Sequence, residues 1–249
     1  MPESATKPTS ARLEPSEKRV RVIINGKTIA DSLRPVLLFE SGARPVWYFP
    51  RADVRTDLIE KSGHESATPA RGPATHWTLA AGNRHVENAL WSHERPPAGL
   101  EALKDYFAFA PDKVDHWFEE DEEMFGHARD PYHRIDVRPS TRRVRVRYAG
   151  ETIADTTRAM FLFETGLPTR YYIPPADVRM DLLAPTQRRT TCPYKGHASY
   201  WTIRVGDRVA DNAVWGYLDP LDECLRIKGM LCFYPEKVEA LEVEGGPAA

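Results

Sequence analysis

The feature that most constrains this sequence is an internal duplication with a fixed offset of 124 residues. Residues 20–114 align with residues 144–238 without an insertion or a deletion. The segments Thr28–Asp31 and Thr152–Asp155 are identical. Four tryptophans keep the same spacing: Trp77, Trp91, Trp201 and Trp215. A repeat this long has the size of a domain, whereas solenoid and propeller units are much shorter. The sequence therefore predicts two copies of one domain, each with its own core.

The ends of the repeat suggest where the chain divides. We predict a disordered tail over residues 1–18, a first repeat domain over 19–118, an acidic connector over 119–142, a second repeat domain over 143–240 and a tail over 241–249. The connector opens with five successive acidic residues, and such a run is typically a solvated surface. Aromatic residues on both sides of the run indicate that the connector packs against a domain.

The short apolar patterns within each copy favour strands. Val20, Val22 and Ile24 alternate with other residues and precede the pair Asn25-Gly26, which is typical of a tight hairpin. Further short apolar runs are separated by turn residues, and only brief helices are expected, near residues 100–103 and 224–227. We therefore expect a mainly β fold with a minor α contribution, built as two tandem β-sandwiches or partly closed barrels.

Composition excludes several classes of protein. The formal net charge of -2 gives no excess of positive charge, so no nucleic-acid partner is expected. The N-terminus lacks the apolar segment of a secretory signal, and no run of about 18 apolar residues is present to span a membrane. We therefore expect a soluble, cytoplasmic protein with no membrane partner.

The cysteines are few and confined to the second copy. Cys192, Cys224 and Cys232 have no CxxC partner, a spacing that favours neither a disulfide framework nor a zinc site. We expect no metal site, and the residues do not identify a cofactor. Apolar neighbours predict that Cys224 and Cys232 are core residues.

The two copies differ most just before the strands that contain Trp77 and Trp201. There the first copy reads TPARGPATH and the second reads CPYKGHASY. The second version brings together a thiol, an amine, phenols and an imidazole, and the first keeps a cation at Arg71. A cation in both copies favours the binding of an anion. The ligand-binding candidates are Arg179, Tyr194, Lys195 and Tyr200, and Cys192 is the only candidate nucleophile.

Several motifs of the chain are similar to those of the family called domain of unknown function 427, also labelled nucleotidyltransferase-like. They are RVRVxxxGxTIAD in both copies, and PPADVRMDLL, TTCPYKGHASYWTI and DNAVWGYLDP in the second. The resemblance implies a compact, mostly β fold similar to the tent-like folds of small ligand-binding and redox domains, and it names no reaction. The first copy departs from the motif at Thr68 and Ala70, so a site carried over by resemblance belongs mainly to residues 144–238.

Nucleotidyl transfer requires neutralisation of the phosphate charges, normally by metal-bridging carboxylates and a backbone cradle. The chain has no GxxxxGK[ST] loop and no paired acidic motif beside a glycine-rich turn. The sequence therefore favours a protein that binds a small molecule or an anion in a pocket of the second domain. Two alternatives stay open: a thiol-dependent enzyme in which Cys192 attacks and His197 is the base, and a scaffold for protein interaction. The alkylation rate of Cys192 relative to a free thiol distinguishes the enzyme from the others.

Overall fold

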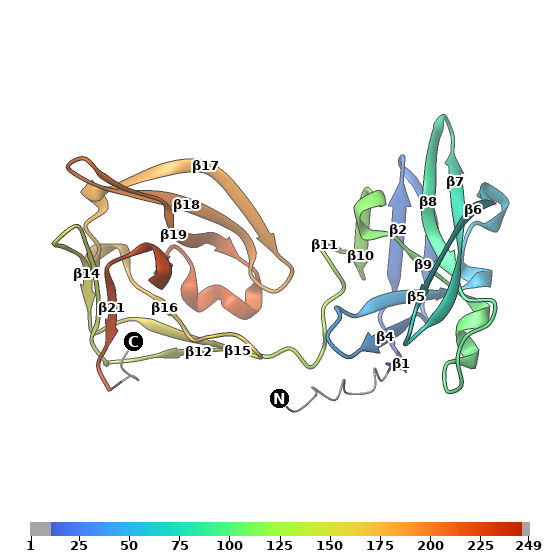
Figure 1. The fold of residues 1–249 in the computed structure, drawn as a ribbon, viewed down its shortest axis with the longest axis horizontal. Coiled ribbons are helices and arrows are strands. Elements are labelled where there is room, and N and C mark those ends of the chain that lie inside the picture. Colours follow the sequence, from blue (N-terminus) through green and yellow to red (C-terminus); the bar gives the residue numbers. More distant parts are fainter. Residues whose placement is uncertain (1–10, 246–249) are drawn as a thin grey trace, which may run out of the picture. The chain divides into compact units, whose positions relative to one another are not determined.

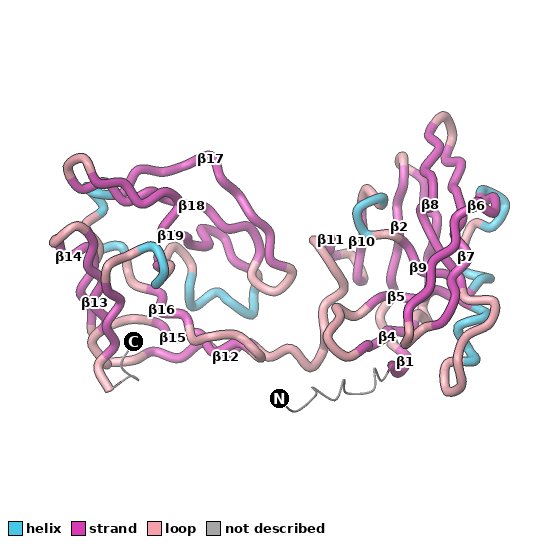
Figure 2. Tube along the Cα trace, in the orientation of Figure 1, coloured by secondary structure: helices cyan, strands magenta, loops and turns pink. Residues whose placement is uncertain are grey.

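The computed structural model describes residues 11–245, which form two compact units, one ending at Asp130 and one beginning at Pro131 (Figure 1). Strands dominate both units and the helices are short 3-10 turns, so the predicted mainly β fold is confirmed (Figure 2). Neither unit closes into a barrel within the described residues, because the sheets have free edges. No helix in the described part of the chain has both the length and the apolar character that crossing a membrane requires.

The first unit contains two antiparallel sheets. The larger has seven strands in the order β1 (Ala11–Pro15), β4 (Val36–Glu40), β5 (Val46–Pro50), β9 (Tyr106–Phe109), β8 (Arg84–Ser92), β7 (Gly72–Ala81) and β6 (Ile59–Thr68). The smaller has the order β11 (Glu122–Met124), β10 (His116–Glu119), β2 (Val20–Ile24) and β3 (Lys27–Ser32). The 3-10 turns are η1 (Arg51–Asp53), η2 (Thr56–Leu58), η3 (Glu101–Asp105) and η4 (Pro111–Lys113).

The second unit repeats this order. One group of strands is β12 (Ile135–Pro139), β15 (Met160–Glu164) and β16 (Arg170–Tyr172), and a bridge between Ile173 and Leu231 connects it to β20 (Leu231–Phe233), β19 (Arg208–Pro220), β18 (Gly196–Val205) and β17 (Leu183–Cys192). The other sheet is β14 (Glu151–Thr156), β13 (Val144–Tyr148) and β21 (Ala240–Val243). The 3-10 turns are η5 (Pro175–Asp177), η6 (Met180–Leu182), η7 (Asp222–Ile227) and η8 (Pro235–Lys237).

The predicted hairpin between β2 and β3 forms as expected. Asn25 and Gly26 have φ values of 50° and 68°, and Ala149 and Gly150 repeat this with 50° and 78°. Positive φ at both central residues matches the right-handed twist of paired strands. The hairpin presents one apolar face, because Val20, Val22 and Ile24 are fully buried in the strand that precedes the turn.

Each unit buries its own apolar residues, as an independent domain requires. In the first unit the main cluster joins the β2–β3 hairpin to the large sheet through residues such as Trp47, Phe49 and Phe109. In the second unit, Phe161 and Phe233 belong to the corresponding cluster. A second cluster of that unit surrounds Tyr172, Tyr200 and Tyr217, next to the loop that the sequence singled out.

The structure corrects the predicted domain boundaries. Residues 11–15, assigned to a tail, form β1 and pair with β4. The start of the predicted connector completes the hairpin of β10 and β11 in the first unit, and residues 135–139 form β12 in the second. Residues 241–243 pair with β13 rather than forming a tail. The rest of the two predicted tails, residues 1–10 and 246–249, lies outside the described residues.

Candidate functional site

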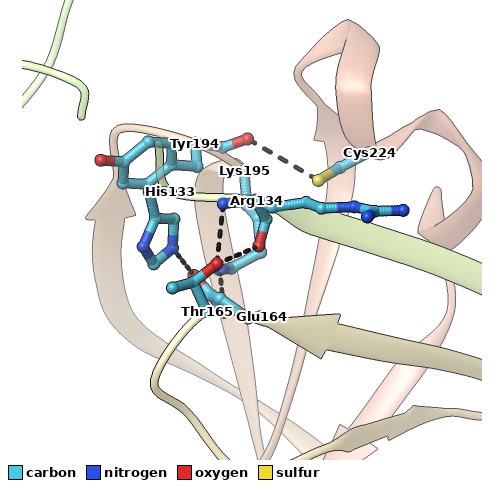
Figure 3. Close-up of polar contacts among 7 residues, drawn as sticks. All are labelled: His133, Arg134, Glu164, Thr165, Tyr194, Lys195 and Cys224. Atoms are coloured by element: carbon cyan, nitrogen blue, oxygen red, sulfur yellow. Dashed lines mark hydrogen bonds and ion pairs between the residues drawn. The ribbon is translucent and has the colours of Figure 1, made fainter. Parts of the chain in front are cut away.

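A buried ion pair lies at the turn between β17 and β18. Lys195 Nζ donates to both carboxylate oxygens of Glu164, at 2.6 and 2.7 Å (Figure 3). Glu164 is the last residue of β15, and Lys195 immediately precedes β18. Both side chains are more than nine-tenths buried, with exposed fractions of 9% for Lys195 and 7% for Glu164. The pair therefore joins two sheet segments at a point shielded from water.

Two further side chains cover this pair. His133, from the segment before β12, approaches Glu164 Oε1 with Nε2 at 2.9 Å. Its ring stacks on Tyr194, with 4.4 Å between ring centroids (Figure 3). The neighbouring Arg134 is held by Thr165, whose hydroxyl accepts the Arg134 amide at 2.9 Å. We call Lys195, Glu164, His133 and Tyr194 the second-unit cluster.

The charges in the second-unit cluster determine the protonation of Glu164. Burial alone would raise the pKa of its carboxyl group, but the hydrogen bonds and positive charges of Lys195 and His133 outweigh burial and lower the pKa. Glu164 therefore stays ionised at neutral pH and accepts hydrogen bonds from both partners. The cost of burying two opposite charges is offset only by such close contacts.

The three cysteines of the second unit lie in different environments. Cys192 ends β17 and is partly buried. His197, the base that the thiol-enzyme alternative requires, has Nδ1 3.0 Å from the Thr191 hydroxyl. Burial raises the pKa of Cys224 to about 11 and that of Cys232 to about 12, so both remain thiols at neutral pH. No group of three or more His, Cys, Asp or Glu side chains among residues 11–245 is arranged to hold a metal ion.

The other predicted binding residues lie in different settings. Tyr200 is 4% exposed, and its hydroxyl is 2.8 Å from the Thr190 hydroxyl. Arg179 is half exposed and forms a two-bond ion pair with Asp181, at 2.8 and 2.6 Å. Tyr194 and Lys195 thus both belong to the second-unit cluster. Tyr200 is buried in the neighbouring apolar cluster. Arg179 pairs with Asp181, which is not a member of the second-unit cluster.

The first unit has a related arrangement at the equivalent positions. Arg71 Nε lies 3.0 Å from Glu40 Oε2, but this buried nitrogen has no partner at a hydrogen-bonding angle. The exposed fractions are 21% for Arg71 and 14% for Glu40, so this pair is less buried than Lys195 and Glu164. A guanidinium carries five N–H donors and an ammonium carries three, so Arg71 has greater donor capacity than Lys195.

A hydrogen-bonded chain lies beside Arg71. Trp91 Nε1 donates to the Tyr48 hydroxyl at 3.0 Å, and that hydroxyl is 3.0 Å from His93 Nε2. His93 Nδ1 is 3.0 Å from the Pro73 carbonyl, which can only accept, so Nδ1 carries the proton and Nε2 accepts from Tyr48. His93 is 2% exposed, and its imidazole is neutral and fully bonded.

Arg71, Trp91 and His93 line a pocket of about 190 Å³. We call it the first-unit pocket, and its lining is Ser66, Thr68, Arg71, Gly72, Ala74, His76, Trp91 and His93. At three positions here the second unit has a larger side chain. Tyr194 replaces Ala70, Tyr200 replaces His76 and Tyr217 replaces His93. Because Tyr200 and Tyr217 are buried, phenol rings occupy in the second unit the positions where the first unit has imidazoles.

Two members of the second-unit cluster were not predicted from the sequence. Glu164 occupies a position that is also glutamate in the first copy, Glu40, and this residue ends the corresponding strand in both units. The glutamate that both copies share was the sequence feature from which Glu164 could have been predicted. His133 lies in the predicted connector, ahead of the aligned second copy that begins at residue 144, so the repeat offered no comparison.

The family comparison agrees with this duplicated architecture. The family described as a domain of unknown function (DUF427) matches residues 12–120 and again residues 136–244. The two matches are offset by the repeat length, and together they cover most of the chain. The chain therefore belongs to this family, as two tandem copies of its domain. Among the curated proteins compared with it, none matches the chain.

The two histidines of the first-unit pocket predict an acid-sensitive domain. Burial lowers the pKa of His93, assisted by the charges of Arg71 and His76, and burial also lowers the pKa of His76. The unfolded chain therefore binds more protons than the folded chain below about pH 6.5, the ordinary histidine value. Stability is present above that pH and falls as the pH drops toward the lowered values.

We expect the first unit to lose free energy of unfolding between pH 7 and 5, and His93→Gln to reduce that loss. Hydrogen exchange of first-unit peptides in the full chain, measured across this pH range, provides the test. An unchanged pH dependence in the variant would contradict the prediction for His93.

Proposed function

We propose that this protein binds a small molecule beside the pair of a cation and a glutamate that both units contain. The pair is Arg71 with Glu40 in the first unit and Lys195 with Glu164 in the second. The observation that carries the proposal is the first-unit pocket, a concave site in which Arg71, His76 and Trp91 converge. Pockets that combine aromatic walls with a few positioned polar groups are typical of ligand sites. The chain contains two copies of the domain and therefore two equivalent positions, and the pocket lies at the position in the first copy.

In the second unit we propose an equivalent site that the side chain of His133 covers. There the sequence-predicted residues Tyr194 and Lys195 would contact a ligand only after the ring of His133 leaves that of Tyr194, because the pair lies over Glu164. Tyr200 would contribute to the wall, as His76 does in the first unit. Arg179 has no part in this proposal, since Asp181 occupies its guanidinium.

No observation favours either alternative over ligand binding. A thiol enzyme needs a base directed at Cys192, and the described contact of His197 Nδ1 is with Thr191. A scaffold without a pocket does not account for the first-unit pocket. Ligand binding accounts for both the pocket and the repeated cation, so it is the function we put forward.

The experiment is a ligand-observed NMR screen of a fragment library with the full chain. His76→Tyr introduces the residue that the second unit has at this position, so it should fill the first-unit pocket while keeping Arg71. Tyr200→Phe is the matched control at the equivalent position of the second unit. We expect a set of fragments whose saturation-transfer signals disappear in His76→Tyr and persist in Tyr200→Phe. If no fragment distinguishes the two variants, ligand binding in the first-unit pocket is excluded.

A further inference from the structure

We propose that the first-unit pocket selects a single-ring aromatic carboxylate, an inference that rests on the proposed function and names its ligand class. Three properties of the pocket lead to this class: the charge of its lining, the state of its hydrogen-bond donors, and the shape of its walls. Each is a property of described side chains of the first unit.

The lining carries one full charge, and that charge is positive. Arg71 is the only formal cation among the eight lining residues, and none of them is acidic. The lowered pKa values of His76 and His93 keep both imidazoles neutral at pH 7. Glu40 pairs with Arg71 but is not part of the lining. A ligand inside the pocket therefore meets the positive charge of Arg71 and no acidic side chain in the lining, which favours an anion.

The donors of the lining are incompletely satisfied. Two buried nitrogens of the lining lack a hydrogen bond of standard geometry within the described structure: His76 Nδ1, and Arg71 Nε, which lies 3.0 Å from Glu40 Oε2. Buried polar groups nearly always have a partner, so two exceptions on one pocket call for an explanation. A carboxylate matches the planar fork of a guanidinium and forms two parallel charge-assisted hydrogen bonds with it. A bound carboxylate would add acceptors for the N–H groups of Arg71 that do not face Glu40.

The equivalent pair of the second unit shows the contrast. Lys195 directs two hydrogen bonds to the two oxygens of Glu164. In the first unit the contact of Arg71 with Glu40 is made at Nε, on one edge of the guanidinium. Arginine at this position thus has N–H groups in addition to the one that faces Glu40. Its guanidinium also contacts the Tyr48 hydroxyl, and the residue lines the pocket.

The shape of the pocket favours one flat ring. The rings of His76 and Trp91 both line it, with 6.3 Å between their centroids. Aromatic side chains stabilise flat ligands by stacking or edge contacts. A cavity of about 150 Å³ is large enough to bind benzene, so a pocket of about 190 Å³ has room for one six-membered ring with a small charged group. Benzoate is the simplest molecule that combines these properties.

The test is a calorimetric titration of the full chain with benzoate, benzamide and phenyl phosphate. Benzamide has the same shape without the charge, and phenyl phosphate carries a tetrahedral oxyanion instead of a planar one. We expect benzoate to bind at least tenfold more tightly than either. Arg71→Leu should abolish the preference over benzamide, and Arg179→Leu, at an exposed arginine of the second unit, should preserve it.

Arg71→Lys keeps the test decisive if Arg71→Leu does not fold. Lysine is the residue of the second unit at this position, and Glu40 is expected to hold its ammonium as Glu164 holds Lys195, so benzoate binding should weaken at least tenfold. Equal binding of benzoate and benzamide would overturn the carboxylate class and leave the pocket as a ligand site. Tighter binding of phenyl phosphate would replace the carboxylate by a phosphate ester. Absence of binding by all three overturns the class, and the fragment screen then decides whether ligand binding itself fails.

Discussion

Gly216→Ser should destabilise the second unit by about 3 kcal/mol, the upper end of the usual cost of overpacking in a core. A Cβ atom built on Gly216 would lie 2.4 Å from the Met230 carbonyl oxygen, a backbone atom that cannot move aside by a side-chain rotation. Gly216 is buried within β19 and pairs with Leu231 of β20. The substitution therefore forces β19 and β20 apart, where their pairing closes the apolar cluster around Trp215 and Cys232.

The first unit supplies an unusual control, because it already has serine at this position. Ser92 is fully buried, and its hydroxyl accepts from Trp77 Nε1 at 3.0 Å. A serine side chain thus fits this position of the fold when the neighbouring strand leaves room for it. Hydrogen exchange of the full chain in dilute denaturant reports each unit separately. We expect faster exchange in peptides of β19 and β20 in Gly216→Ser, and unchanged exchange in the first unit. Unaltered protection of β19 would disprove the steric argument.

The strands that the sequence predicted well are those that bury an apolar face. The pattern at Val20, Val22 and Ile24 has a period of two and ends at a turn pair that admits positive φ. The long strands β6 and β17 were missed. Both lie at the end of a sheet and are mostly exposed, and they contain residues such as Gly63 and Pro185 that disfavour central strands. Polar residues are tolerated on an edge, so an edge strand leaves no apolar signal in the sequence.

The candidate site was predicted only in part for a related reason. Lys195 and Tyr194 stood out because the copies differ there. Glu164, their partner, is the same in both copies and lies far from them in the sequence, so only the pairing of β15, β16 and the bridge to β20 brings it close. Arg179 was a candidate because the first copy also has arginine at this position, Arg55, but a carboxylate two residues away, Asp181, pairs with its guanidinium.

The first unit illustrates a limit of judging a site by family motifs. Departure from the motif at Thr68 and Ala70 suggested a lost site, yet the first-unit pocket lies beside this loop. Replacing a phenol by a smaller side chain removes volume, and whether the surroundings fill the space depends on packing that the sequence does not specify. The same substitution that removes a functional group can therefore open a binding site.

Lys195→Met should destabilise the second unit by about 3–5 kcal/mol at pH 7, the cost of leaving a buried charge without its partner. Methionine keeps most of the side-chain volume but removes both hydrogen bonds to Glu164, whose carboxylate would keep the contact with His133. The second substitution Glu164→Gln removes the orphaned charge, so the double variant should recover much of the loss. Urea denaturation monitored by hydrogen exchange of second-unit peptides measures both effects.

The matched substitution in the first unit is Arg71→Met, and it should cost less. Arg71 and Glu40 are two to three times more exposed than their counterparts, so water can solvate the remaining carboxylate. Equal losses in the two units would show that burial does not determine the cost of breaking the pair.

The dependence of the Lys195→Met effect on pH follows from the state of Glu164. In the parent, its pKa is lowered, so the carboxylate stabilises the fold above its unfolded pKa and that contribution is lost as the pH falls through the folded value. In Lys195→Met, burial acts with less opposition and should raise the pKa of Glu164. Protonation then relieves the penalty as the pH falls. The difference in free energy of unfolding between parent and variant should therefore shrink from pH 7 toward pH 4. A difference that stays constant over this range would mean that the lysine acts through packing rather than through its charge.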